Sequence, residues 1–216
     1  MLSIKCFVVN GIQENCYVIN DESREAVIID CGAQTLEEWN LIEEYISRQQ
    51  LRPIHLLNTH AHFDHIWGVN FVYETYGLKP EMHPDDIFLY ENVADQFRAI
   101  LHRDIPLLLP PNGPILTEGE SIDFGTHHLS VITTPGHTPG GICFFCQEES
   151  VLFTGDTIFR QAIGRTDLPY GNSSSLQHSI LQKILTLPKQ TVLYPGHGEP
   201  TTIGAEQAYY GVEYLS

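Results

Sequence analysis

Basic residues are scarce in this sequence. Among 216 residues there are 11 Lys and Arg against 27 Asp and Glu, which gives a formal net charge of −16 when the histidines are neutral. A strongly acidic surface repels both the phosphate backbone of nucleic acids and the headgroups of anionic membranes. We therefore expect a small-molecule substrate, and neither nucleic acid nor a membrane as a partner.

Long apolar runs are missing as well. No segment reaches the roughly 20 apolar residues that a membrane-spanning helix needs, and the N-terminal residues lack the pattern of a signal peptide. The five cysteines are odd in number and lie among apolar neighbours, which favours buried free thiols over a disulfide framework. These absences predict a cytoplasmic protein, and nothing in the sequence indicates its oligomeric state.

Short apolar runs separated by turn residues predict the secondary structure. Three such runs within the first 30 residues are typical of antiparallel strands. Thr35 and Glu38 form a capping-box pattern that opens a helix. A second long helix is expected over residues 84–101, with Asp85 and Asp86 beside the positive end of its dipole.

The second half of the chain repeats this order, with strands followed by helices near residues 174–187 and 205–210. Strand-rich halves that each end in helices predict two sheets packed face to face with helices outside, an α/β fold of the four-layer αββα sandwich type. A chain of this length can bury one substantial core, so residues 1–216 are expected to form a single domain.

Four residues of types that bind metals lie in one short segment, at His60, His62, Asp64 and His65. The segment follows an apolar strand, so the two histidines two positions apart point the same way while the next two residues can face a second ion. Neutral imidazole and carboxylate are ligands that zinc prefers. A lone histidine at a strand end is usually a satisfied polar residue, but this spacing rarely occurs by chance.

Three further fragments each place one ligand-type residue in a glycine- or proline-rich loop after an apolar strand. These residues are His137, Asp156 and His197. Each fragment alone is a weak signal. Their shared form indicates that one edge of the sheets presents all of them, together with the first cluster.

With these motifs the sequence resembles the metallo-β-lactamase superfamily, and within it the glyoxalase II-like (hydroxyacylglutathione hydrolase-like) metallo-hydrolases. The resemblance implies a first metal held by His60, His62 and His137, and a second held by Asp64, His65 and His197. Asp156 would bridge the two ions. The true β-lactamases of the superfamily do not have this bridging aspartate, so Asp156 argues against antibiotic hydrolysis.

The segment after Asp156 resembles both bacterial glyoxalase II-like proteins and persulfide dioxygenases of the same fold. It contains Arg165 and Tyr170, our candidates for substrate contacts, although Arg165 could instead pair with Asp167 or Asp30. Asp30 ends a buried strand and is expected to support the histidine loop. Only 19 residues follow His197, so the helical extension that binds glutathione in longer glyoxalase II enzymes is expected to be largely absent.

Six further histidines are interpreted as surface or helix-cap residues: His55, His83, His102, His127, His128 and His178.

Together these residues predict a metal-dependent hydrolase with two divalent ions, zinc first, with iron and manganese as alternatives. A metal-bridging hydroxide would attack the carbonyl of a small acyl thioester, with Asp64 and Asp156 as the catalytic carboxylates. A thiol leaving group needs no strong general acid, because its pKa is near 8.5.

Three alternatives remain open. One is a lactone hydrolase, and another is a mononuclear iron persulfide dioxygenase that uses His60, His137 and Asp156. The third is a non-catalytic, metal-stabilised binding module.

Overall fold

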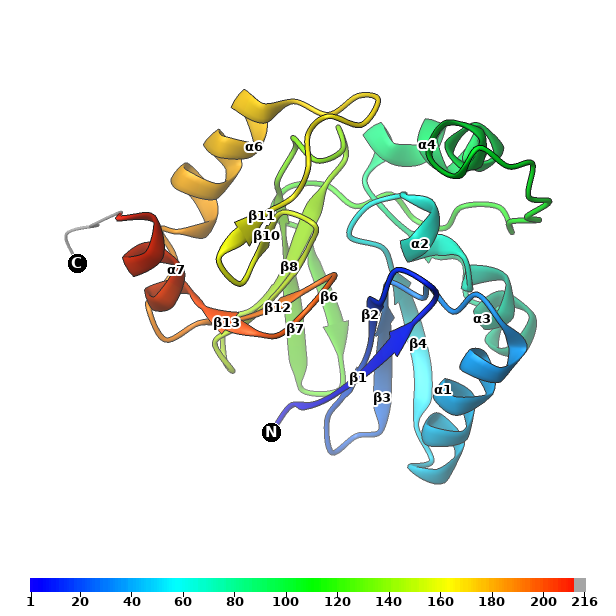
Figure 1. Cartoon of the computed structure of the whole chain (residues 1–216). Helices are drawn as coiled ribbons and strands as arrows, with labels where there is room; N and C mark the ends of the chain where they lie inside the picture. The colour runs from blue at the N-terminus through cyan, green and yellow to red at the C-terminus, as the bar shows by residue number, and fades with distance from the viewer. Residues whose placement is uncertain (212–216) are drawn as a thin grey trace.

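The computed structural model describes residues 1–211. Two β-sheets lie face to face in the middle of the molecule (Figure 1). Helices α1 (Leu36–Arg48) and α3 (Val69–Tyr76) cover the outer face of the first sheet, and α6 (Ser173–Ser179) and α7 (Ile203–Tyr210) cover that of the second. The predicted four-layer αββα architecture is confirmed.

The first sheet has five strands in the order β1-β2-β3-β4-β5. The first three are antiparallel, as predicted, while β4 and β5 run parallel to β3. Both faces of the sheet are buried, because Val18 and Ile28 pack towards the helices whereas Tyr17 and Ile29 face the other sheet. The strands are β1 (Ser3–Val9), β2 (Glu14–Asn20), β3 (Glu25–Ile29), β4 (Arg52–Leu57) and β5 (Pro80–Glu81).

The second sheet has six strands in the order β13-β12-β9-β8-β7-β6, and only β9 and β12 are parallel neighbours. A separate two-stranded hairpin, β10 (Ile158–Phe159) and β11 (Ala162–Ile163), lies beside it. The strands of the sheet are β6 (Ser121–Phe124), β7 (His127–Thr133), β8 (Ile142–Cys146), β9 (Val151–Gly155), β12 (Val192–Pro195) and β13 (Thr201–Thr202).

The core consists of three apolar layers, one between the sheets and one under each set of helices. In the central layer the rings of Tyr17 and Phe153 meet edge to face with centroids 5.2 Å apart. In the outer layers, Trp39 and Ile42 of α1 cover the first sheet, and Leu176 of α6 covers the second. Burial on this scale is the main source of stability for such a fold.

The long helix expected over residues 84–101 is broken, so that prediction is wrong. Asn92 leaves helical geometry (φ −109°, ψ 33°). Its backbone N–H and its side-chain amide both donate to the carbonyl of Phe88, at 3.1 and 2.7 Å, so α4 ends there. The segment consists of the 3₁₀ turn η1 (Pro84–Asp86), α4 (Ile87–Glu91), α5 (Val93–Gln96) and the π-helical η2 (Phe97–Leu101). In the second half, α6 likewise continues as the π-helical η3 (Ile180–Ile184).

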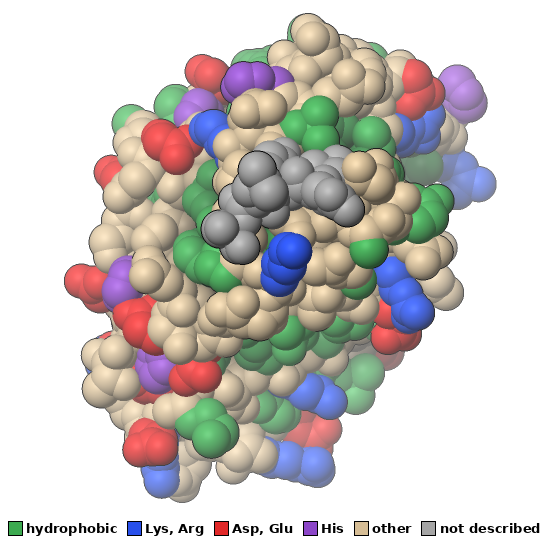
Figure 2. Space-filling model, turned by 90° about the vertical axis from the view of Figure 1, so that its left-hand side faces the viewer, with side chains coloured by type: hydrophobic (Ala, Val, Ile, Leu, Met, Phe, Trp, Pro, Cys, Tyr) green, Lys and Arg blue, Asp and Glu red, His purple; other side chains and the backbone are tan. Residues whose placement is uncertain are grey.

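The surface and the cysteines agree with several of the absences noted in the sequence. Among residues 1–211 no helix has the length and apolar character to cross a membrane. All five cysteines are free, and four of them are buried as expected, whereas Cys6 is exposed. On the face that carries α6 and α7, Lys and Arg side chains are dispersed among acidic and polar ones and form no continuous basic patch (Figure 2).

His127 does not lie on the surface, which corrects its interpretation from the sequence. Its side chain is buried between two carboxylates, with Nδ1 3.1 Å from Asp21 and Nε2 3.1 Å from Glu149. These carboxylates raise its pKa, against the opposing effect of burial.

Candidate metal centre

The seven predicted ligands come together at one edge of the two sheets, although the chain delivers them separately. The first sheet contributes four of them, since the loop after β4 leads into the short helix α2 (Phe63–Ile66). The second sheet contributes three, from the loops that follow β7, β9 and β12. They are His60, His62, Asp64 and His65 from the first sheet, and His137, Asp156 and His197 from the second.

Two groups of three ligand atoms can be distinguished, each with its members within 4.8 Å of one another. The first group is His60, His62 and His137, in which Nδ1 of His62 lies 2.8 Å from Nε2 of His137. The second is Asp64, His65 and His197, in which Nε2 of His197 lies 3.2 Å from Oδ2 of Asp64.

Asp156 lies between these two groups. Its Oδ1 is 3.4 Å from Nε2 of His65 in the second group, and its Oδ2 is 3.4 Å from Nε2 of His137 in the first. Only a glycine fits beside it at position 196, because a Cβ there would lie 2.4 Å from Oδ1 of Asp156. This carboxylate can therefore contact ions in both groups at once.

The inner atoms of this cluster fit metal ions. His60 Nε2, His65 Nε2 and Asp156 Oδ1 are buried, and within the described chain none of them has a well-formed hydrogen bond. Buried polar atoms are rarely left without a partner, so their shared direction indicates an occupant that accepts lone pairs. Histidine and carboxylate donors suit a divalent ion such as zinc or iron.

The outer ring nitrogens hold the histidines in orientation. Nδ1 of His137 donates to the backbone carbonyl of Arg165 at 2.7 Å, and Nδ1 of His65 lies 3.1 Å from Oδ2 of Asp30. Nδ1 of His197 lies 3.1 Å from the carbonyl of Gln13. This arrangement, with one nitrogen hydrogen-bonded outward and the other left for a metal, is usual for histidine ligands.

Burial, helped by neighbouring histidines, keeps two of the histidines neutral. Burial lowers the pKa of His62 to about 3 and that of His60 well below its ordinary value, and neighbouring histidines add to both effects. Burial alone would also lower the pKa of His65, but Asp64, Asp156 and Asp30 outweigh it and raise that pKa. His60 and His62 therefore carry the free lone pairs that a metal requires at neutral pH.

Asp30 lies where the sequence analysis expects a supporting residue. Its carboxylate accepts hydrogen bonds from the backbone N–H of Thr59 at 2.7 Å and from the Thr59 hydroxyl at 2.6 Å, in addition to its contact with His65. Glu14, which no motif indicated, is fully buried with Oε1 3.9 Å from Nδ1 of His65. Burial raises its pKa well above the ordinary value. Two acids thus flank the outer nitrogen of His65.

Asp86 lies at the N-terminal end of α4, beside the positive end of its dipole as predicted. It also has a role that the sequence did not indicate, since its side chain is buried between the loops that carry the ligands. Its Oδ2 accepts hydrogen bonds from the Ala61 N–H at 2.9 Å and the Thr138 hydroxyl at 2.8 Å, and its Oδ1 accepts one from the Gly140 N–H at 2.7 Å. A single carboxylate therefore joins the His60–His62 loop to the His137 loop.

We expect Asp86→Ala to destabilise the protein by about 3 kcal/mol, because it leaves two buried N–H groups without acceptors. Metal affinity should fall as well, since the two ligand loops lose their connection. The matched control is Asp85→Ala, which removes the neighbouring exposed carboxylate. Denaturant unfolding of both variants measures the effect, and equal free energies of unfolding for the two would contradict this assignment.

The two candidate substrate contacts lie in different cavities. Arg165 lines a cavity of about 390 Å³ over the metal cluster, and its guanidinium donates two hydrogen bonds, at 2.8 and 2.7 Å, to Asp167. Of the two partners considered for Arg165, the structure thus favours Asp167. Tyr170 lines a neighbouring cavity, where its ring contacts Phe88 edge to face at 4.8 Å.

Comparison with known proteins gives relatives that match almost the whole chain. Hydroxyacylglutathione hydrolase GloC of Haemophilus influenzae is 34% identical over 207 residues, which are 95% of this chain and 95% of that protein. The mitochondrial persulfide dioxygenase ETHE1 of Mus musculus is 34% identical over 182 residues, which cover 84% of this chain and 62% of that protein.

Solved structures agree with this relationship. BLEG-1 B3 metallo-beta-lactamase superposes with a TM-score of 0.86 and 38% identity, covering 95% of this chain and 97% of its own. TTHA1623 in a di-iron-bound form gives a TM-score of 0.82 and 35% identity, covering 94% and 96%. Residues 9–197 also match the family model of the metallo-beta-lactamase superfamily. The chain belongs to the metallo-β-lactamase superfamily and carries a cluster of histidines and aspartates suited to divalent metal ions.

Proposed function

We propose that the protein is a metal-dependent hydrolase that cleaves small acyl thioesters. The observation that carries the proposal is the position of Asp156, whose two oxygens face two separate groups of ligand-type side chains. This is the arrangement that a centre for two divalent ions requires. The similarity to the hydroxyacylglutathione hydrolase GloC supports a thioester as the substrate.

The ions would be held by the two groups of residues described above, with Asp156 shared between them. Zinc is our first candidate, and the similarity to a di-iron-bound structure makes iron the second. Bound ions of this kind lower the pKa of a coordinated water towards 7 and polarise a substrate carbonyl.

The chain itself contributes position and exclusion of water. Phe63, Ile163 and Leu168 are among the apolar side chains of the cavity over the metal cluster, and they limit the water around a bound carbonyl. Asp64 and Asp156 lie on its floor, where their carboxylates can accept hydrogen bonds from the attacking water and so orient it. The departing thiol needs no protein acid, because it leaves readily as a thiolate.

We further propose that the chain acts on a small molecule as a single domain, in the cytoplasm, without nucleic acid or membrane partners. The two sheets share one central apolar layer, which supports one domain. Five free thiols fit a reducing compartment, and the formal charge of −16 disfavours polyanionic partners.

The proposal is tested by assaying the zinc-loaded protein with S-lactoylglutathione and with the lactoyl thioester of N-acetylcysteamine. We expect both to be hydrolysed, with kcat/KM values within about tenfold of each other. Among the described residues, Arg165 is the only Lys or Arg that lines either cavity, and it is already paired with Asp167, so little is available to hold the glutathione carboxylates. Failure to hydrolyse either compound would overturn the proposal.

A persulfide dioxygenase is the second candidate function, because ETHE1 matches 84% of the chain. His60, His137 and Asp156 would then form a two-histidine, one-carboxylate face for a single iron. Metal analysis of protein purified without added metal separates the two candidates, since one iron per chain favours the dioxygenase and two ions favour the hydrolase. Oxygen consumption with glutathione persulfide is the corresponding assay.

Lactones and β-lactams complete the substrate panel. A lactone would undergo the same attack on its carbonyl and is our alternative hydrolytic substrate. The similarity to BLEG-1, named as a B3 metallo-beta-lactamase, makes a β-lactam a necessary comparison. We expect no β-lactam turnover, because the true β-lactamases of the superfamily do not have the bridging aspartate that Asp156 would provide.

A further inference from the structure

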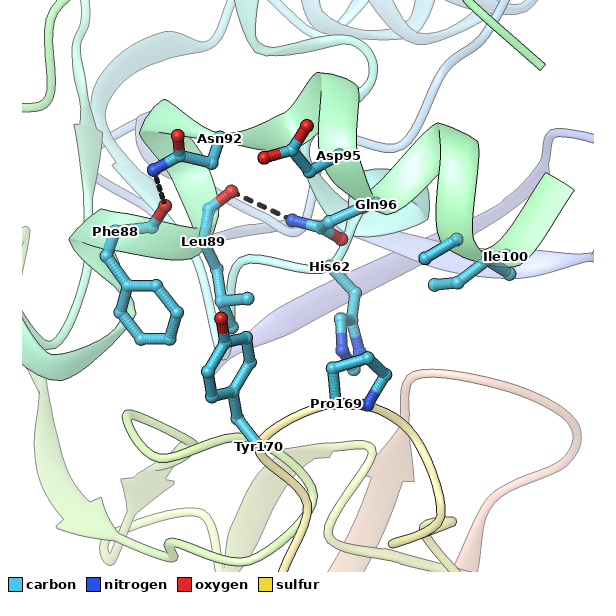
Figure 3. A pocket seen from close by; sticks show the side chains of 10 residues that line it. His62, Phe88, Leu89, Asn92, Asp95, Gln96, Ile100, Pro169 and Tyr170 are labelled. Atoms are coloured by element: carbon cyan, nitrogen blue, oxygen red, sulfur yellow. Dashed lines mark hydrogen bonds between the residues drawn. The ribbon is translucent and has the colours of Figure 1, made fainter. Parts of the chain in front are cut away.

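A second cavity, also of about 390 Å³, lies beside the metal cluster. Segments α4, α5 and η2 form one wall, and the loop with Pro169 and Tyr170 forms the other (Figure 3). The apolar and aromatic side chains of its lining are those of Phe88, Leu89, Ala99, Ile100, Pro169 and Tyr170. In Figure 3 the Tyr170 ring stands beside Phe88 at one end, and His62 reaches in at the other.

This cavity adjoins the cavity over the proposed reaction centre. His62 lines both cavities, and so does Ile100. Since Nδ1 of His62 lies 2.8 Å from Nε2 of His137, the end of the cavity at His62 is within the first ligand group. A substrate whose carbonyl lies over the cluster can therefore extend one of its ends into this second cavity.

The two side-chain amides of the cavity are already engaged. The Asn92 amide donates to the carbonyl of Phe88 at 2.7 Å. The amide nitrogen of Gln96 donates to the carbonyls of Ala61 and Leu89 at 2.8 and 2.9 Å, and its oxygen accepts from the N–H of Phe63 at 3.0 Å. Because both amides are hydrogen-bonded to backbone groups, the apolar side chains remain as the main contacts for a ligand.

Among the described residues that line this cavity there is one acid, Asp95, and no Lys or Arg that could receive a carboxylate. Arg98, which follows on the same helical segment, is paired with Asp95 at 2.8 Å and with Asp104 at 2.6 Å. The glutathione part of a substrate carries two carboxylates, and the described lining of this cavity offers neither of them a Lys or Arg.

We propose that the second cavity binds an uncharged apolar group of the substrate, such as an aryl or branched alkyl group, so that the preferred thioesters have such a group on the acyl or thiol side. That the ligand is a thioester rests on the proposed hydrolase function. That the cavity binds an apolar group does not depend on it. The observation behind it is an apolar cavity, free of unpaired cations, that opens onto the ligand cluster at His62.

Binding is tested on the purified holoprotein with two thioethers that cannot be hydrolysed, ethyl benzyl sulfide and S-ethylglutathione. Calorimetry should show binding of ethyl benzyl sulfide, at least about tenfold tighter than that of S-ethylglutathione, because an aryl group gains this much from burial. Ala99→Trp should fill the cavity and weaken the binding at least tenfold. Ala94→Trp, an equally exposed change on α5 outside the cavity, should have no effect.

Kinetics then identify which end of the substrate enters the cavity. The lactoyl thioester of benzyl mercaptan and the phenylacetyl thioester of glutathione carry the aryl group on opposite sides. At least one should exceed S-lactoylglutathione in kcat/KM by about tenfold, and Ala99→Trp should remove that advantage.

The inference is overturned if S-ethylglutathione binds as tightly as ethyl benzyl sulfide, or if Ala99→Trp and Tyr170→Ala both leave the binding unchanged. Tyr170→Ala opens the cavity instead of filling it. The test therefore remains decisive even if the Trp variant does not fold. Binding without any thioester turnover would support the cavity while refuting the proposed hydrolase. Turnover that favours S-lactoylglutathione over both aryl thioesters would refute the cavity alone.

Discussion

Asp156→Ala is expected to abolish hydrolysis, with a loss in kcat of at least about a hundredfold, and to lower the metal content of both ligand groups. Loss of groups that merely orient metal ligands costs 10–100-fold, and Asp156 is itself in contact distance of both groups. Turnover of the thioester and metal content per chain, measured on the same preparation, give the result.

A matched control for this variant is Asp123→Ala, which removes an exposed carboxylate from β6. It should retain normal activity and two metal ions. If the Asp156 variant also kept two tightly bound ions and near-normal turnover, Asp156 would not be a ligand shared between the two ions.

Removal of metal by a chelator is expected to lower the melting temperature by roughly 10 °C. A ligand present at 1,000 times its dissociation constant stabilises a native state by about 4 kcal/mol, and about 1 kcal/mol corresponds to 2–4 °C for a protein of this size. Without metal, Nε2 of His60, Nε2 of His65 and Oδ1 of Asp156 remain buried without a well-formed hydrogen bond to any described residue. Thermal unfolding with and without chelator measures the difference.

Re-addition of zinc after the chelator is removed should restore the original melting temperature, which controls for direct effects of the chelator. The amount of bound metal should be measured in each state. An unchanged melting temperature after confirmed loss of metal would mean that these side chains do not hold ions in the folded protein.

The architecture and the position of the ligands could be predicted from the sequence because both are recorded locally. An apolar run of strand length, or the capping box at Thr35, is a pattern among residues only a few positions apart, and each such pattern predicts one strand or helix. The spacing of His60, His62, Asp64 and His65 is likewise a local pattern. Each of His137, Asp156 and His197 follows an apolar strand and a turn. This shared pattern predicted that the three residues lie at one edge of the sheets, and the structure places them there.

The residues that the sequence analysis missed act through distant partners. Asp86 accepts hydrogen bonds from Gly140, 54 positions away, and His127 pairs with Asp21 across 106 positions. Glu14 is a single acid at the start of a strand, and its significance arises only from the packing of His65 against it. The break at Asn92 is a change in the backbone angles of one residue, which propensities alone do not reveal.

The division of the ligands between the two sheets has a consequence for the topology of the chain. His62 and His137 are 75 positions apart, and they belong to opposite sheets. An ion that joins them closes a long loop in the way that a disulfide does, and it restricts the unfolded chain by an entropy that grows slowly with loop length. The sheets can then separate only after a coordinate bond breaks, so the metal centre acts as a reversible cross-link between the two halves of the fold.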